Sequence, residues 1–228
     1  MTDTNLNIVF VLFPNVTQLD FTGPLQVLSR LPGASVHLAG QSMEPVATDA
    51  VLTLNPTCTF AECPPADVLC VPGGFGVDDA ILNPTLMDFV RKESARARYV
   101  TSVCTGAFIL GAAGVLKGKR ATTHWAYHDM LGEVGAIPVK ERVVRDGNIF
   151  TGGGVTAGID FAFTLMTEIV GEEFAKGLQL GLEYDPAPPF DSGSPDKAAP
   201  EALERMTTFY ADRGTKFRAN LAKAMTNN

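Results

Sequence analysis

Short apolar runs bounded by glycine or proline recur along the first two thirds of the chain. Residues 7–13 are almost continuously apolar and end at Pro14, and residues 35–40 and 67–71 have a similar character. Runs of this length without a helical period are typical of strands that are buried on both faces of a parallel sheet. The pattern therefore predicts an α/β protein with a mainly parallel central sheet.

Helical patterns lie between these strands. Residues 84–97 carry apolar side chains on one face and charges on the other, which predicts an amphipathic helix. Thr22 is a suitable N-cap and Pro24 is tolerated in a first helical turn, so we expect a helix from residue 22 to about Leu31. Residues 200–225 predict a last helix, which packs on the domain or on a second subunit.

Turn signals indicate the remaining organisation. Residues 46–54 predict an edge hairpin, and residues 142–151 predict another around the Asp146-Gly147 turn. Residues 186–195 are rich in proline, glycine and serine, which is typical of an irregular arm. We therefore expect one α/β domain over residues 6–185, followed by a C-terminal arm and helix over residues 186–228.

The most informative stretch is residues 99–111. A β-branched run leads to Cys104, and a small residue, Gly106 and an apolar helical pattern follow. This order predicts a strand, a tight turn and a helix, which is the build of a nucleophile elbow. Peptide dipoles at the helix start favour a thiolate over a thiol. The alternative is that Cys104 is a small buried apolar residue, as most free cysteines are.

Other polar residues fall where a parallel sheet forms its crevices. Asp20 follows the first strand, either in the loop or just inside the next helix, and a helix-capping role is the alternative. His124 follows a short strand and is a candidate base for a Cys–His pair. The Gly73-Gly74 turn can present backbone N–H groups, provided that Cys104 lies beside it.

Three consecutive glycines, residues 152–154, precede a predicted helix. They imitate a phosphate-binding loop, but the chain has neither a G-x-G-x-x-G motif nor a P-loop lysine. We therefore reject nucleotide binding and expect this backbone to pass close to the cysteine turn.

Composition and charge exclude several classes of partner. The chain has 228 residues, 46% of them hydrophobic, which suffices for one full core. A net charge of −7 without a basic stripe argues against nucleic acid and anionic membranes. Residues 8–13 are too short to span a bilayer and the first residues lack the basic start of a signal peptide, so we expect a soluble cytoplasmic protein.

The four cysteines show no metal-binding or disulfide pattern. No pair has C-x-x-C spacing, so we expect free thiols and no zinc site. The cysteines are Cys58, Cys63, Cys70 and Cys104.

Several segments together resemble the ThiJ/PfpI superfamily, whose fold is glutamine-amidotransferase-like, over roughly residues 6–185. The resemblance implies a single-domain, flavodoxin-like three-layer sandwich, a homodimer, and no metal or organic cofactor. The matching segments are Gln-Leu-Asp-Phe-Thr-Gly-Pro at 18–24, Ser-Val-Cys-Thr-Gly at 102–106, Thr-Thr-His-Trp-Ala-Tyr-His at 122–128, and residues 151–160 and 182–190.

Within the superfamily these segments resemble most those of the isocyanide hydratases. The resemblance implies Cys104 and Asp20 as the catalytic pair. Two departures from the wider superfamily agree with it: Asp20 stands where many members have glutamate, and Thr105 stands where peptidase-like members have histidine. Such enzymes convert an isocyanide and water into an N-formamide. We expect a covalent thioimidate on Cys104, Asp20 as acid and base, and Thr105 as a positioning group.

The sequence also predicts residues of the pocket around this pair. We expect backbone N–H groups of Gly74 and Thr105 to stabilise developing charge. The candidates for the substrate pocket are Phe75, His124, Trp125, Gly153 and Gly154.

Two other functions are also compatible with these residues. A cofactor-free glyoxalase or amidohydrolase would use Cys104 with His124 as its base. A non-enzymatic ligand or redox sensor would use Cys104 as an oxidisable thiol.

Overall fold

The computed structural model describes residues 5–226, and its centre is a seven-stranded sheet. All neighbouring strands are parallel except the pair at one edge, β10 and β11. This confirms the predicted sheet. Its order is β10 (Val143–Asp146), β11 (Ile149–Gly152), β7 (Tyr99–Val103), β6 (Val68–Val71), β1 (Leu6–Val11), β2 (Ala34–Gly40) and β5 (Cys58–Thr59).

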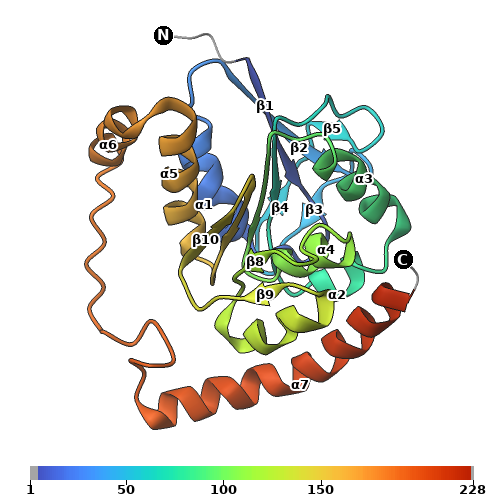
Figure 1. Ribbon diagram of the computed structural model, residues 1–228, viewed down its shortest axis with the longest axis vertical. Helices are drawn as coiled ribbons and strands as arrows, with labels where there is room; N and C mark the ends of the chain where they lie inside the picture. The colour runs from blue at the N-terminus through green and yellow to red at the C-terminus, as the bar shows by residue number, and fades with distance from the viewer. Residues whose placement is uncertain (1–4, 227–228) are drawn as a thin grey trace.

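Helices cover both faces of the sheet (Figure 1). Successive residues of β1 enter two different cores: Ile8 and Phe10 lie under one helical layer, whereas Val9 and Val11 lie under the other. The expected three-layer sandwich is therefore confirmed. One layer holds α1 (Gln18–Leu28), α5 (Ala157–Val170) and α6 (Glu172–Gly181), and the other holds α2 (Val77–Ala80), α3 (Pro84–Ser94), α4 (Gly106–Ala112), η1 (Trp125–Val134) and α7 (Pro200–Thr226).

Two small sheets complete the domain. The expected edge hairpin pairs β3 (Val46–Ala47) with β4 (Thr53–Leu54). A second sheet pairs β8 (Arg120–Ala121) in parallel with β9 (Ile137–Pro138) just before and after η1. It places the residues after β8 beside the carboxyl end of β7.

The start of α1 differs from the prediction. The helix begins at Gln18 with Thr17 in the N-cap position, so Thr22 is not the cap and Pro24 lies inside the helix. Tertiary packing overrides the local signal, because the helix buries Phe21 and Pro24 against the sheet and α5, and only one helical hydrogen bond is lost to the proline. Asp20 consequently stands in the first turn of α1.

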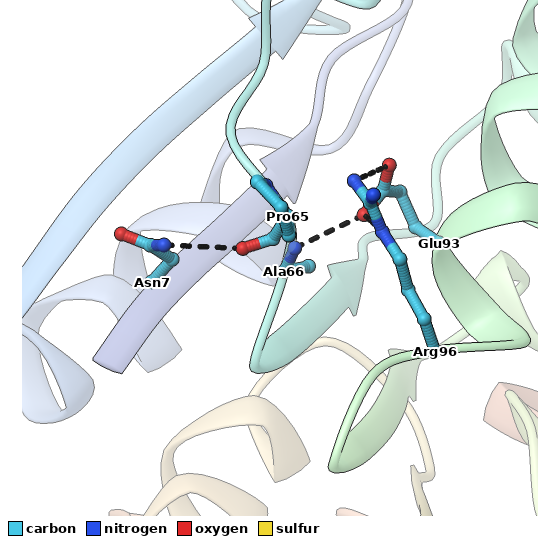
Figure 2. A network of polar contacts seen from close by, with 5 residues as sticks. All are labelled: Asn7, Pro65, Ala66, Glu93 and Arg96. Carbon is cyan, nitrogen blue, oxygen red and sulfur yellow. Dashed lines mark hydrogen bonds and ion pairs between the residues drawn. The ribbon is translucent and has the colours of Figure 1, made fainter. Parts of the chain in front are cut away.

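A buried carboxylate ties α3 to the segment that leads into β6 (Figure 2). Glu93 is fully buried, accepts a hydrogen bond from the Ala66 N–H at 3.0 Å and pairs with the Arg96 guanidinium through both carboxylate oxygens. The neighbouring Pro65 carbonyl accepts from the Asn7 side chain at 3.1 Å. These contacts fix the entry of β6, whose other end carries the glycine turn.

The arm and the C-terminal helix follow the domain. Residues 186–199 run without strand or regular helix from α6 to the start of α7 (Figure 1). The second half of α7 packs on α2, α4 and η1, where Phe217 and Leu221 are buried. Within residues 5–226 no helix is both long and apolar enough to cross a bilayer.

A matched pair of glycine substitutions tests the close packing of α4 on the sheet. A Cβ at Gly106 would lie 2.3 Å from the Val71 carbonyl oxygen, whereas a Cβ at the exposed, helical Gly177 would meet nothing within 4 Å. We expect Gly106→Ala to lower the free energy of unfolding by about 3 kcal/mol. Gly177→Ala should raise it by about 0.5–1 kcal/mol. Urea unfolding monitored by circular dichroism measures both, and equal stabilities would refute the packing argument.

Candidate functional site

Cys104 stands on the sharp turn between β7 and α4, with a positive φ of 55°. Few residues other than glycine adopt this conformation, so the surroundings must hold it. The Cys104 N–H donates to the Gly152 and Gly153 carbonyls at 3.1 and 2.8 Å, and the Cys104 carbonyl accepts from the Thr123 hydroxyl at 2.7 Å. The predicted elbow is confirmed, as is the close passage of the glycine run.

Asp20 is almost fully buried beside this turn. Its side chain leaves its own helix, and Oδ2 accepts a hydrogen bond from the Gly73 N–H at 3.0 Å. The buried Oδ1 has no hydrogen-bond partner of ordinary geometry among the described residues. Burial raises the pKa of Asp20 to about 7, against the opposing effects of the Gly73 N–H and the neighbouring Cys104 thiol. A helix-capping role does not fit this orientation.

The two acids, Cys104 and Asp20, share one buried corner. Burial raises the pKa of the Cys104 thiol, the nearby Asp20 carboxyl raises it further, and the Thr105 N–H and hydroxyl act in the opposite direction. The expected thiolate preference is therefore wrong for the resting site, because desolvation outweighs the helix start. Near neutral pH the carboxyl ionises before the thiol and can exchange a proton with it.

Thr105 connects the elbow to the glycine turn after β6. Its hydroxyl accepts a hydrogen bond from the Gly74 N–H at 3.0 Å and lies 3.3 Å from the Gly74 carbonyl oxygen. The Gly74 N–H is thus occupied, which contradicts its expected role in stabilising charge on an intermediate. The Thr105 N–H, in contrast, interacts with the Cys104 sulfur.

Only glycine fits at position 73, because neighbouring atoms leave no room for a side chain. A Cβ there would lie 2.6 Å from the Thr105 nitrogen and 2.8 Å from Asp20 Oδ2. Any side chain would push apart the two residues that flank Cys104.

His124 is positioned as a hydrogen-bond donor. It occupies the N-cap of η1, where its Nδ1 accepts from the Ala126 N–H at 3.3 Å, so the ring proton stands on Nε2. Burial lowers the pKa of His124 to about 4, which keeps the ring neutral at pH 7. Neither feature suits a general base that activates Cys104, and the Cys–His interpretation loses its support.

A cavity of about 600 Å³ opens above the elbow. Gly74, Phe75 and His124 line it together with Cys104 and Thr105, as expected.

The other expected pocket residues lie outside this lining. Gly153 supports the elbow from behind through its carbonyl, and Gly154 lies against the His124 ring. Trp125 lines a second hollow between η1 and α7, although its ring centroid lies 5.6 Å from that of His124. Its place in the substrate pocket is thus not supported.

Several cavity residues were not anticipated from the sequence. Tyr127 of η1 and four residues of α7 form one wall. The Arg213 guanidinium stacks over the Phe75 ring, 4.0 Å from its centroid, and Lys216 pairs with Asp78 at 2.8 Å. The α7 residues are Tyr210, Arg213, Lys216 and Phe217, and their helical spacing was the available signal.

The raised pKa of Asp20 predicts a pH-dependent cost to stability. The unfolded chain releases this proton near pH 4 and the folded chain near pH 7, so stability falls as the pH rises between these values. Asp20→Asn removes the ionisation and should stabilise the protein above pH 7, by up to about 4 kcal/mol. The gain should vanish near pH 4. Urea unfolding of both proteins at pH 4 and pH 8 measures the difference, and a gain that is independent of pH would contradict the assignment.

Comparisons with known proteins agree with this arrangement. An isonitrile hydratase from Pseudomonas putida is 62% identical over 198 residues, which cover 87% of this chain and 86% of that protein. The crystal structure of a ThiJ/PfpI family protein from Pseudomonas syringae superposes with a TM-score of 0.93 at 41% identity, over 95% of this chain and 90% of that one. Protein DJ-1alpha from Drosophila melanogaster is 29% identical over 75% of this chain and 80% of its own length. Residues 6–168 match the DJ-1/PfpI family model, and the chain belongs to the DJ-1/PfpI family.

Proposed function

We propose that this protein is an isocyanide hydratase, which adds water to an isocyanide (isonitrile) to give an N-formamide. The observation that carries the proposal is the buried pair of Cys104 and Asp20 at the base of the cavity. The 62% identity to the isonitrile hydratase of Pseudomonas putida, over most of both chains, supports the same chemistry.

The first half of the reaction joins Cys104 to the substrate. The sulfur attacks the terminal isocyanide carbon while Asp20 takes the thiol proton, and Asp20 then gives that proton to the same carbon. The product is a thioimidate, R–N=CH–S–Cys104. A carboxyl with a pKa of about 7 suits both transfers, because it holds and releases a proton with little cost at neutral pH.

The second half is hydrolysis of the thioimidate. Asp20 as carboxylate accepts a proton from water, and the water oxygen bonds to the thioimidate carbon. The tetrahedral adduct then expels Cys104, which recovers its proton from Asp20. The sum is R–NC plus water giving R–NH–CHO, with both side chains restored.

Thr105 positions other groups in this cycle and does not itself transfer a proton. Its N–H interacts with the Cys104 sulfur and stabilises the leaving thiolate, and its hydroxyl holds the Gly74 peptide against the elbow. The side chain thereby keeps the Gly73 N–H directed at Asp20.

We retain a homodimer as the proposed assembly. The resemblance to ThiJ/PfpI proteins supports it, and so do apolar side chains that stand exposed on α6 and the arm, Phe174, Leu180 and Phe190.

The catalytic pair is tested by formamide production from an aryl isocyanide. Cys104→Ser should lose at least about 10³-fold in kcat/KM and Asp20→Asn nearly as much, because each removes a group that reacts or transfers a proton. Cys70→Ser is the matched control, since Cys70 is a core residue of β6. An Asp20→Asn variant with a near-wild-type rate would refute the scheme. Wild-type turnover of α-oxoaldehydes but not isocyanides would favour the glyoxalase alternative.

The role of the Thr105 hydroxyl predicts different activities for two conservative variants. Thr105→Ser keeps the hydroxyl that accepts from the Gly74 N–H, whereas Thr105→Val keeps the shape and leaves that N–H without its acceptor. We expect a loss of about 10–100-fold in kcat for Thr105→Val and less than about 3-fold for Thr105→Ser, from the typical cost of one hydrogen bond. Equal losses in both variants would indicate that the methyl group matters instead.

A further inference from the structure

In the proposed hydrolysis, water supplies every proton, but no side chain has been assigned to deliver one to the nitrogen. When water adds to the thioimidate, the nitrogen gains a bond to hydrogen, while Asp20 is occupied with the proton from the water. A donor must therefore face the nitrogen from another wall of the cavity. The identity of that donor rests on the proposed function.

Tyr127 has the placement that this role requires. It belongs to η1, lines the cavity above Cys104 and is only 6% exposed. Its hydroxyl makes no hydrogen bond to any residue in the described part of the chain. The hydroxyl oxygen is not completely enclosed by protein, so a ligand in the cavity can reach it and supply the missing partner.

The Tyr127 ring is held by two perpendicular aromatic contacts. Phe217 of α7 packs edge-on at 5.4 Å between centroids, and Tyr210 of the same helix does so at 5.7 Å. The ring also borders the second hollow, but the phenol oxygen lies within electrostatic range of Cys104, Arg213 and Asp78, which line only the Cys104 cavity. Tyr127 can therefore present its hydroxyl to the cavity that contains Cys104.

The other donors of the cavity fit the role less well. The neutral His124 ring offers only an Nε2–H, which is a weaker acid than the Tyr127 phenol even though burial raises the pKa of Tyr127 to about 12. The Arg213 guanidinium is stacked on the Phe75 ring. Lys216 pairs with Asp78, and Tyr210 is only half-buried.

We propose that the Tyr127 hydroxyl hydrogen-bonds the nitrogen of the Cys104 thioimidate and protonates it when water adds to the thioimidate carbon. In that step the water oxygen bonds to carbon, Asp20 takes the water proton, and the C=N electron pair takes the Tyr127 proton. When the C–S bond breaks, the new hydroxyl group returns a proton to the tyrosinate and Asp20 returns one to the sulfur. Tyr127 thus acts in hydrolysis and not in the formation of the adduct.

The test is Tyr127→Phe, with the covalent adduct on Cys104 and the released formamide followed separately. An aryl isocyanide is mixed with the enzyme, the intact protein is weighed by mass spectrometry at short times, and formamide is quantified. We expect adduct formation within about 3-fold of wild type and formamide release reduced about 10²–10³-fold, the usual loss for one such donor. The adduct should then accumulate as the main form of the enzyme.

Tyr184→Phe is the matched control, because the Tyr184 hydroxyl donates to Asp160 at 2.7 Å and does not line the cavity. It should turn over at the wild-type rate. Tyr127→Phe keeps both ring contacts and loses no protein hydrogen bond, so its melting temperature should equal that of wild type.

Three outcomes overturn the assignment. Turnover of Tyr127→Phe close to wild type would show that the nitrogen gets its proton elsewhere. Slower formation of the adduct without its accumulation would indicate a role in binding or packing. A wild-type protein that forms neither adduct nor formamide with a panel of isocyanides would refute the proposed function itself, and the role of Tyr127 with it.

Discussion

The site depends on one close approach, that of the Gly73 peptide to the elbow. The absence of a side chain lets the Thr105 backbone and the Asp20 carboxyl come within contact of the same Cα. The Gly73 N–H then fixes the carboxyl, and the next peptide fixes the Thr105 hydroxyl. Three segments far apart in sequence, α1, the turn after β6 and the start of α4, meet there because parallel strands end at one edge.

Several features that lower the stability of the folded protein lie at this same point. A positive φ at Cys104, a carboxyl oxygen of Asp20 without a regular partner and a raised pKa of that carboxyl all reduce stability. The flanking structure compensates with two fully buried cores and with ties such as that of Glu93 to the entry of β6. A rigid surrounding holds the two acids together despite their mutual repulsion when both are ionised.

Much of this could be predicted from sequence, because strands buried on both faces and a strand–turn–helix cysteine leave local signals. Cys104, Asp20 and Thr105 were anticipated together, although the last two owed their roles to a resemblance. The start of α1 and the orientation of Trp125 were not predictable, since packing decides them. The division of the chain at residue 185 stays a prediction, and the structure shows α7 contributing to the same cavity as residues before it.

That contribution has a consequence for how the cavity varies among relatives. The family match ends at residue 168, whereas Tyr210, Arg213 and Phe217 lie on α7, three and four residues apart along one face. A single inserted or deleted residue before them would rotate the whole face by about 100°. All three would leave the cavity at once while the elbow stayed intact. Substrate range can therefore evolve by a shift in helical register, with the chemistry inherited unchanged.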